Sequence, residues 1–195
     1  MAGVLRRLEE LPVAIRIMVI GGVGGMIAGM MMAMVEMLYG AFNSTRSFWD
    51  SGMAIWSWVF GAEHFTQNDP GAHVGPVILG IGAHMANSMM FGIMFAALMY
   101  MFRPRGFMAP MMVGMAMSLG AWAIMRYGIL PLNAGEDDLF TKDIVSPQWV
   151  WWVAHGVMGM FAAMYYLAVR PYLVAGSDAK VSPSSGDRAL QPTGS

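Results

Sequence analysis

The chain has 195 residues, of which 57% are hydrophobic and only 12% are charged, whereas charged residues make up about 25% of a typical soluble domain. This length suits one domain. A net charge of −1 and the absence of a basic stripe argue against nucleic-acid binding. Cysteine is absent, which excludes disulfides, thiolate metal sites and thiol catalysis.

Four apolar runs are each long enough to cross a bilayer as a helix, which takes about 20 residues. They cover residues 13–38, 74–102, 107–127 and 149–169. We therefore predict an all-α polytopic membrane protein whose four-helix transmembrane domain occupies residues 1–175. The Ser-, Gly- and Pro-rich segment 176–195 is predicted to be a flexible tail.

The basic residues fall on one side of this four-span topology. They lie around the start of the first span, in the turn between the second and third, and after the fourth: Arg6, Arg7, Arg16, Arg103, Arg105, Arg170, Lys180 and Arg188. The loops on the opposite side are mostly acidic. Because cytoplasmic loops carry an excess of Lys and Arg, both termini are predicted to be cytoplasmic.

The first outer loop, residues 41–72, is rich in aromatic side chains, namely Phe48, Trp49, Trp56, Trp58 and Phe60. Such a segment is typical of a short helix lying at the level of the lipid headgroups. A surface that docks a partner is the alternative interpretation.

A weak internal repeat relates the two halves of the chain. An offset of 67 matches Gly92 with Gly159, and an offset of 90 matches Gly24 with Gly114. A composition biased toward Gly, Ala and Met is the alternative explanation. A true duplication would give two helical hairpins related by an axis normal to the membrane.

Small residues spaced four apart allow close approach of helices in lipid. This spacing selects five glycines as packing positions: Gly21, Gly25, Gly29, Gly92 and Gly159. The same stripes contain His84 and His155, so both histidines should face protein and not lipid.

The ionisable residues of the spans are predicted to form one layer. Glu36, His84 and Arg126 each lie about 20 residues, or roughly 30 Å, from the inner boundary. His155 lies about 7 Å deeper. Glu36 and Arg126 could simply pair where their helices end. The functional alternatives are a metal held by His84, His155 and Glu36, a haem ligated by the two histidines, or proton transfer.

Methionine is unusually frequent, with 24 residues. The plain interpretation is that Met fills apolar positions in place of Leu. Copper(I), which favours thioether ligands, is the alternative. Met26, Met30 and Met34 are four apart, but their stripe is rotated about 140° from the glycines of the same helix. They should therefore face lipid or a partner, which weakens the copper interpretation.

The second half of the chain resembles the YagU-like family of uncharacterised bacterial inner-membrane proteins. The resemblance rests on His84, on Arg-Pro-Arg at 103–105, on a Gly/Ala-rich third span that ends in an acidic loop, and on Trp-Val-Ala-His-Gly at 152–156 followed by Arg170. It covers about half of the chain. It implies a four-helix topology in a bacterial inner membrane and the placement of the histidines, and nothing about catalysis.

No phosphate loop, nucleophile elbow or pair of buried carboxylates is present, so no catalytic residue is predicted. We expect a non-catalytic accessory or structural subunit of a larger membrane complex, with the lipid bilayer and other subunits as partners and no resident cofactor. The alternatives are a small proton or copper transporter that uses the intramembrane His and Glu residues, and a haem-carrying electron-transfer subunit.

Overall fold

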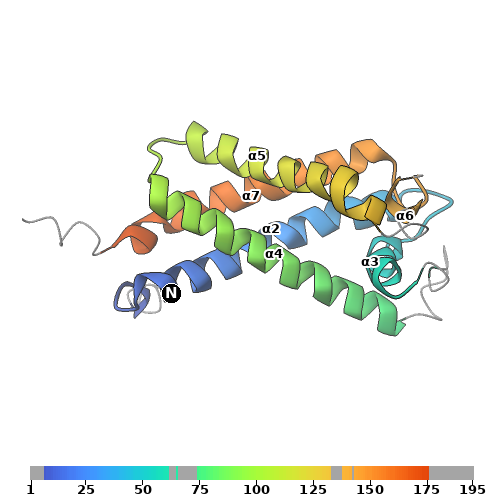
Figure 1. Ribbon diagram of the computed structural model, residues 1–195, viewed down its shortest axis with the longest axis horizontal. Coiled ribbons are helices and arrows are strands. Elements are labelled where there is room, and N and C mark those ends of the chain that lie inside the picture. The colour runs from blue at the N-terminus through green and yellow to red at the C-terminus, as the bar shows by residue number, and fades with distance from the viewer. Residues whose placement is uncertain (1–6, 62–64, 66–73, 133–137, 142, 176–195) are drawn as a thin grey trace, which may run out of the picture.

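The computed structural model describes residues 7–61, 65, 74–132, 138–141 and 143–175. Four long helices form its body: α2 (Val13–Ala41), α4 (Val74–Phe102), α5 (Met108–Ile124) and α7 (Gln148–Val174) (Figure 1). Each is long and apolar enough to span a membrane when α5 is counted with the turns that follow it as far as Leu132. The prediction of an all-α protein with four membrane-crossing helices is confirmed. The predicted tail, 176–195, lies outside the described residues.

Two helices run further than predicted. The helix α2 ends at Ala41 and not at residue 38, and α7 continues to Val174, past Pro171. Pro12 and Pro147 precede the first residues of α2 and α7, where the missing N–H of proline costs no helical hydrogen bond.

The third span does not end at Tyr127 as predicted. After α5 the chain passes into the π-helical turn η3 (Met125–Ile129) and the 3₁₀ turn η4 (Leu130–Leu132). Gly128 and Pro131 are poor helix formers, and proline has no N–H to donate. A π turn closes its hydrogen bond over five residues. Met125 and Leu130, five apart, accordingly line the same cavity.

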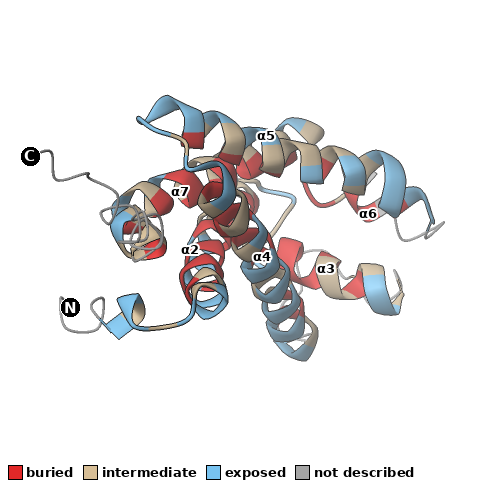
Figure 2. Cartoon of the chain, turned by 60° about the vertical axis from the view of Figure 1, so that its left-hand side comes forward, coloured by how far each residue is buried: buried red, intermediate tan, exposed pale blue. Residues whose placement is uncertain are grey.

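The helices form a splayed bundle in which α2 and α7 pack together at the centre (Figures 1 and 2). The helix α4 packs on α2 and α5 packs on α7, whereas α4 and α5 make little contact. We call the end with Val13, the close of α7 and the α4–α5 turn the terminal end. The opposite end, which carries α3 (Asp50–Phe60) and α6 (Asp138–Thr141), is the loop end. The predicted aromatic loop thus contains a helix.

Glycines let the backbones of neighbouring helices touch. A Cβ added at Gly25 would lie 2.1 Å from the carbonyl oxygen of Ser88, and one at Gly92 would lie 2.2 Å from that of Gly21. In the second pair of helices, a Cβ at Gly159 would lie 2.4 Å from the oxygen of Gly114. No side chain fits at these positions. We call these contacts the glycine crossings.

The two glycine crossings occupy related positions in the chain. A Cβ at Gly92 would lie 2.4 Å from the Cα of Gly25, and one at Gly159 would lie 2.7 Å from the Cα of Met115. Gly92 and Gly159 are separated by the offset of 67, and residues 25 and 115 by the offset of 90. This is the arrangement that a duplicated hairpin predicts.

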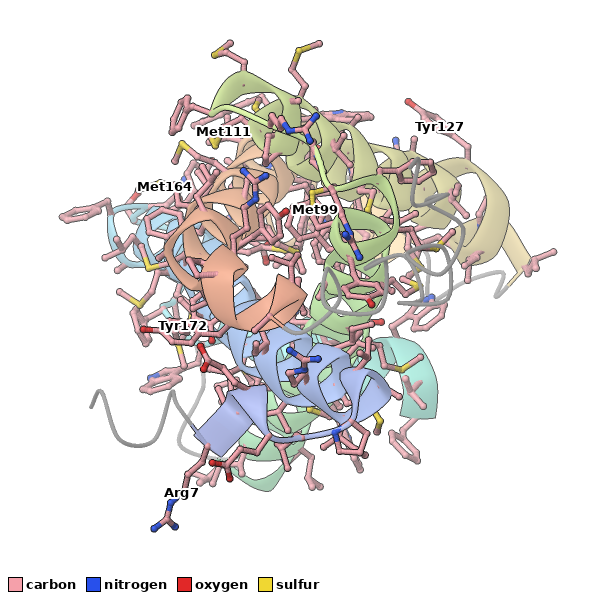
Figure 3. All side chains as sticks on the ribbon, turned by 90° about the vertical axis from the view of Figure 1, so that its left-hand side faces the viewer. Arg7, Met99, Met111, Tyr127, Met164 and Tyr172 are labelled. Carbon is pink, nitrogen blue, oxygen red and sulfur yellow. The ribbon has the colours of Figure 1, made fainter. Side chains whose placement is uncertain are left out.

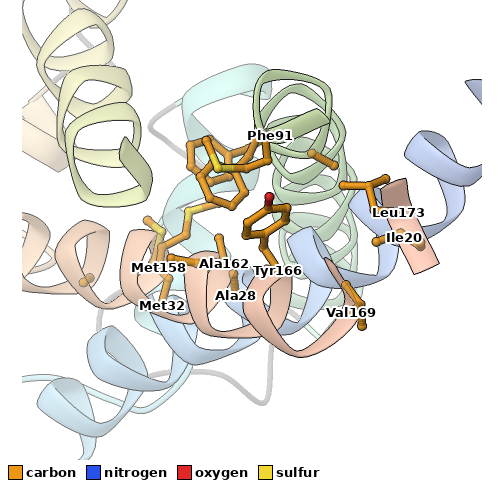
Figure 4. Close-up of a cluster of buried hydrophobic side chains, with 14 residues drawn as sticks. Ile20, Ala28, Met32, Phe91, Met158, Ala162, Tyr166, Val169 and Leu173 are labelled. Atoms are coloured by element: carbon orange, nitrogen blue, oxygen red, sulfur yellow. The ribbon is translucent and has the colours of Figure 1, made fainter. Parts of the chain in front are cut away.

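The main core lies between α2, α4 and α7 and includes Ile20, Ala28, Phe91 and Tyr166 (Figure 4). Figure 3 looks along the helices from the terminal end. It shows Met99 inside the bundle, and Tyr127 and Met164 pointing away from its centre. The outward apolar side chains give the bundle a surface suited to lipid.

Arg16 is a buried charge of α2 at the terminal end, with an exposed fraction of 4%. Its Nη1 donates to the carbonyl oxygens of Tyr172 (3.2 Å) and Ala175 (2.6 Å). Carbonyls at the end of a helix have no partner within it and carry partial negative charge. Arg16 therefore joins the start of α2 to the end of α7.

Candidate functional site

A cavity of about 340 Å³ lies at the loop end, between α2, α3, α4, the α5–η4 segment, α6 and α7. We call it the loop-end cavity. Three of the predicted site residues line it, namely Glu36 of α2, His84 of α4 and His155 of α7. Residues from three different membrane-crossing helices thus meet at one space.

Arg126, the fourth predicted member of the polar layer, does not line the cavity. It lies on η3, where its guanidinium carbon is 5.8 Å from the ring centroid of Tyr127. Its neighbour Met125 takes the cavity side, and successive residues of a helix point in different directions. Among the described residues, no ion pair joins Arg126 to Glu36, so the pairing considered as the structural alternative is not formed.

Glu36 has an exposed fraction of 5%, and its Oε1 is buried without a hydrogen-bond partner. The residue lies on the face of α2 that continues the glycine stripe, seven positions after Gly29. A buried polar atom that lacks a partner costs about 1–3 kcal/mol, and more when the group is charged. The free oxygen of Glu36 is therefore expected to destabilise the fold.

Each of the two histidines donates a hydrogen bond to a backbone carbonyl. The two imidazole rings are not hydrogen-bonded to each other. Nε2 of His84 lies 3.0 Å from the carbonyl oxygen of Gly29, across the α2–α4 contact. Nδ1 of His155 lies 2.8 Å from that of Trp151, one turn earlier on α7. A carbonyl oxygen only accepts, so these nitrogens carry the protons. In the neutral rings, the lone pairs then lie on Nδ1 of His84 and Nε2 of His155.

Aromatic rings form much of the remaining wall. Trp122 stacks on Trp151, with a centroid distance of 5.4 Å, and on His155, at 4.9 Å. Phe140 of α6 packs against Trp151 at 5.3 Å, and Trp58 of α3 completes this set. The stacking of Trp122 across one turn of α7 fixes the position of His155.

The sequence did not indicate that these aromatic side chains belong to the site, and it placed Trp58 in a segment typical of the lipid headgroup level. A signal for Trp122 does exist. Gly114, Ser118 and Trp122 are four apart and all buried, so Trp122 continues the stripe on which α5 crosses α7. The four-residue spacing could therefore have predicted that Trp122 faces α7.

The cavity reaches the surface of the bundle beside α4. Ala83 and Asn87 both line it and are both exposed, and Val59 of α3 is 57% exposed. The helix α4 makes little contact with α5, which leaves this side open. Asn87 thus presents an amide at the side of a membrane-crossing helix.

The metal and haem hypotheses gain no ligand set here. Within the described ranges, no group of three His, Cys, Asp or Glu residues could hold a metal ion. Nε2 of His84 is already engaged with Gly29. On the methionine stripe of α2, Met26 and Met30 are both at least 40% exposed and face outward. They do not meet in a common lumen.

No protein-family model, no curated protein and no solved structure matches the chain. The resemblance to the YagU-like family stays a prediction.

Proposed function

We propose that the protein is a non-catalytic membrane protein that binds a small amphiphilic molecule in the loop-end cavity. The observation that carries this proposal is the cavity of about 340 Å³ into which Glu36, His84 and His155 project among apolar walls. Ligand pockets are typically 300–1,000 Å³ and combine apolar walls with a few polar groups that orient the ligand. An ionisable residue within a span is a functional hypothesis by default.

The pattern of hydrogen bonds supports binding over a purely structural role. Polar groups that hold helices in register satisfy one another, because a half-satisfied buried network destabilises the fold. Here both histidines use backbone carbonyls, and Oε1 of Glu36 has no partner. The free oxygen is the feature that a ligand would satisfy.

A conducting path is less well supported than a closed binding site. Toward the terminal end, the cavity is followed by the main core, where Ala28, Phe95 and Met158 are buried. The space among the glycines and Tyr166 there is only about 10 Å³, which is at the lower limit for holding one water molecule. Transport of protons or metal would need the helices to part, and it stays an untested alternative.

The binding proposal is tested by cysteine protection, since the natural chain has no cysteine. Ala83→Cys places one thiol on the cavity wall, and Met94→Cys places one on the same helix, exposed and away from the cavity. The rate of labelling by N-ethylmaleimide is measured in detergent with benzyltrimethylammonium, its uncharged isostere neopentylbenzene, or phenylmethanesulfonate. We expect saturable protection of Ala83→Cys and none of Met94→Cys. If none of the three molecules protects Ala83→Cys selectively, the proposal is wrong.

An accessory role in a larger membrane complex is the second candidate, favoured by the exposed Asn87. An amide turned to hydrocarbon is costly, and neighbouring helices satisfy such groups with hydrogen bonds. Gly82 and Ala86 beside it are also exposed and small enough for close approach of another helix. Native electrophoresis in mild detergent tests this role: wild type should migrate with partner subunits that Asn87→Leu releases. Migration of the wild type alone would argue against it.

We further propose that the protein resides in a bacterial inner membrane with both termini in the cytoplasm. The arginines near the terminal end support this orientation. The test uses Phe42→Cys, exposed near the loop end, and Phe107→Cys, exposed in the α4–α5 turn. In intact cells, a membrane-impermeant maleimide should label only Phe42→Cys. Labelling of Phe107→Cys alone would reverse the topology.

A further inference from the structure

The residues that line the loop-end cavity also indicate which ligand charge it would favour. We propose that its ligand is a small organic cation, an amine or quaternary ammonium ion that carries apolar substituents. This inference rests on the proposed function, because it names the chemical class of the bound molecule. It is carried by the placement of one buried carboxyl group within an aromatic wall.

Glu36 is the only acidic residue that lines the cavity, and the lining contains no Arg or Lys among the described residues. Its free Oε1 accepts hydrogen bonds or pairs with a positive charge. A carboxylate that is removed from water needs such a partner. In the described part of the chain, no basic side chain supplies one, so a ligand cation would fill that role.

The two histidines add acceptors and not donors on the sides that are free of backbone contacts. Their protons go to the carbonyl oxygens of Gly29 and Trp151. In the neutral rings, the lone pairs of Nδ1 of His84 and Nε2 of His155 remain available. Together with Glu36, three side chains on three helices offer acceptors to a ligand that brings donors or positive charge.

The aromatic wall favours the same class of ligand. The faces of Trp, Tyr and Phe rings carry partial negative charge, and Trp attracts cations most strongly. Trp58, Trp122 and Trp151 all line the cavity, and Phe140 lies with them. Apolar substituents on the cation would contact the same rings. A strongly hydrated inorganic ion has no such substituents, so the organic cation fits the cavity better.

Other charge classes fit less well. An anion needs positive side chains or several converging N–H groups, and the described lining residues include no Arg or Lys. Arg126 is turned toward Tyr127. A metal ion lacks a set of three His, Cys, Asp or Glu ligands within the described ranges. The organic cation is the class that uses both Glu36 and the rings.

The volume limits the size of the ligand. At about 30 Å³ for each water-sized group, a space of about 340 Å³ holds about 11 heavy atoms. Benzyltrimethylammonium has this size, and it combines a permanent charge with an aryl ring. Neopentylbenzene has the same shape with carbon in place of nitrogen, so the two probes differ in charge alone.

The experiment compares the two probes on Ala83→Cys alone and on Ala83→Cys combined with Glu36→Gln. On Ala83→Cys, the cation should protect at a concentration at least about tenfold lower than the neutral probe, which corresponds to about 1.4 kcal/mol. Adding Glu36→Gln should raise the concentration needed for the cation at least about tenfold and leave the neutral probe unchanged. Thermal unfolding of both proteins verifies that each is folded.

A second variant keeps the test independent of Glu36. Trp58→Leu should weaken protection by the cation more than protection by neopentylbenzene, whereas Trp149→Leu, exposed and outside the cavity, should change neither. Equal protection by both probes, unaffected by Glu36→Gln, would overturn the cation proposal and leave the binding function standing. Absence of protection by any probe would instead remove the binding function itself.

Discussion

At the glycine crossings, α2 meets α4 and α5 meets α7 so closely that a single added carbon would strike a backbone oxygen. Toward the loop end, the same helices are held apart. There α4 leaves α2 and packs on α3, where Gly80 meets Gly52, and Trp122 stands between α5 and α7. The change from Gly114 to Trp122 along α5, and the packing of α4 on α3, turn tight contacts into a lined space.

The two buried charges of α2 show the same contrast. Arg16, near the terminal end, donates to two carbonyls of α7. Glu36, near the loop end, is equally buried and keeps an oxygen without a partner. Nε of Arg16 also lacks a partner, but its guanidinium still makes two bonds to α7, whereas Oε1 of Glu36 makes none. Arg16 therefore links two helices, whereas Oε1 of Glu36 is left free beside the loop-end cavity.

The largest expected effect is on the glycine crossing of α2 and α4. Gly92→Ala should lower the free energy of unfolding by about 1–3 kcal/mol or more, because the new Cβ meets the carbonyl oxygen of Gly21 and the backbones must separate. Unfolding by sodium dodecyl sulfate, followed by circular dichroism, measures this change.

The matched control lies on the same helix. A Cβ at Gly82 would meet nothing within 4 Å. Gly82→Ala should therefore raise stability by about 0.5–1 kcal/mol, since glycine is the poorer helix former. Equal effects of the two substitutions would show that the crossing does not depend on close approach.

The second prediction compares the buried charges directly. Arg16→Met should cost about 1.5–3 kcal/mol, because hydrogen bonds from a charged donor to the end of α7 are lost. Glu36→Met should leave the stability unchanged or raise it by about 1–3 kcal/mol, because it removes a buried oxygen without a partner. Both are measured by the same unfolding titration.

A marked loss of stability in Glu36→Met would mean that Glu36 supports the fold. It would then belong with Arg16 as a structural charge, and the contrast between the two ends of the bundle would disappear. A gain in stability together with loss of ligand protection is the pattern expected of a binding residue.

Sequence was sufficient for the four spans because hydrophobic length is a local property. Spacing also selected Gly25 and Gly92, which do meet, and it placed Glu36, His84 and His155 at similar depths. Counting residues along a helix gives depth, and these three side chains share one cavity.

Depth alone does not give direction, and there the prediction for Arg126 fell short. Met125 and Leu130 face the cavity because the chain forms a π turn after α5. That turn depends on the tertiary packing around Gly128 and Pro131. The part played by Trp58 and Phe140 was also out of reach, because both come from short helices in loops. Their position follows from tertiary contacts that no local pattern encodes.

The smallest expected effect concerns the histidine at the boundary between the two regions. His84 bonds to Gly29 at the end of the glycine stripe and also lines the cavity. His84→Leu should cost only about 0.5–1.5 kcal/mol, because it removes one neutral hydrogen bond. Asn87→Leu, one turn along α4 and exposed, is the control and should cost nothing measurable in detergent. A loss of stability much larger than this range for His84→Leu would mean that His84 mainly holds α4 against α2. A loss of stability within this range, together with weaker protection of Ala83→Cys by benzyltrimethylammonium, would assign His84 to ligand binding.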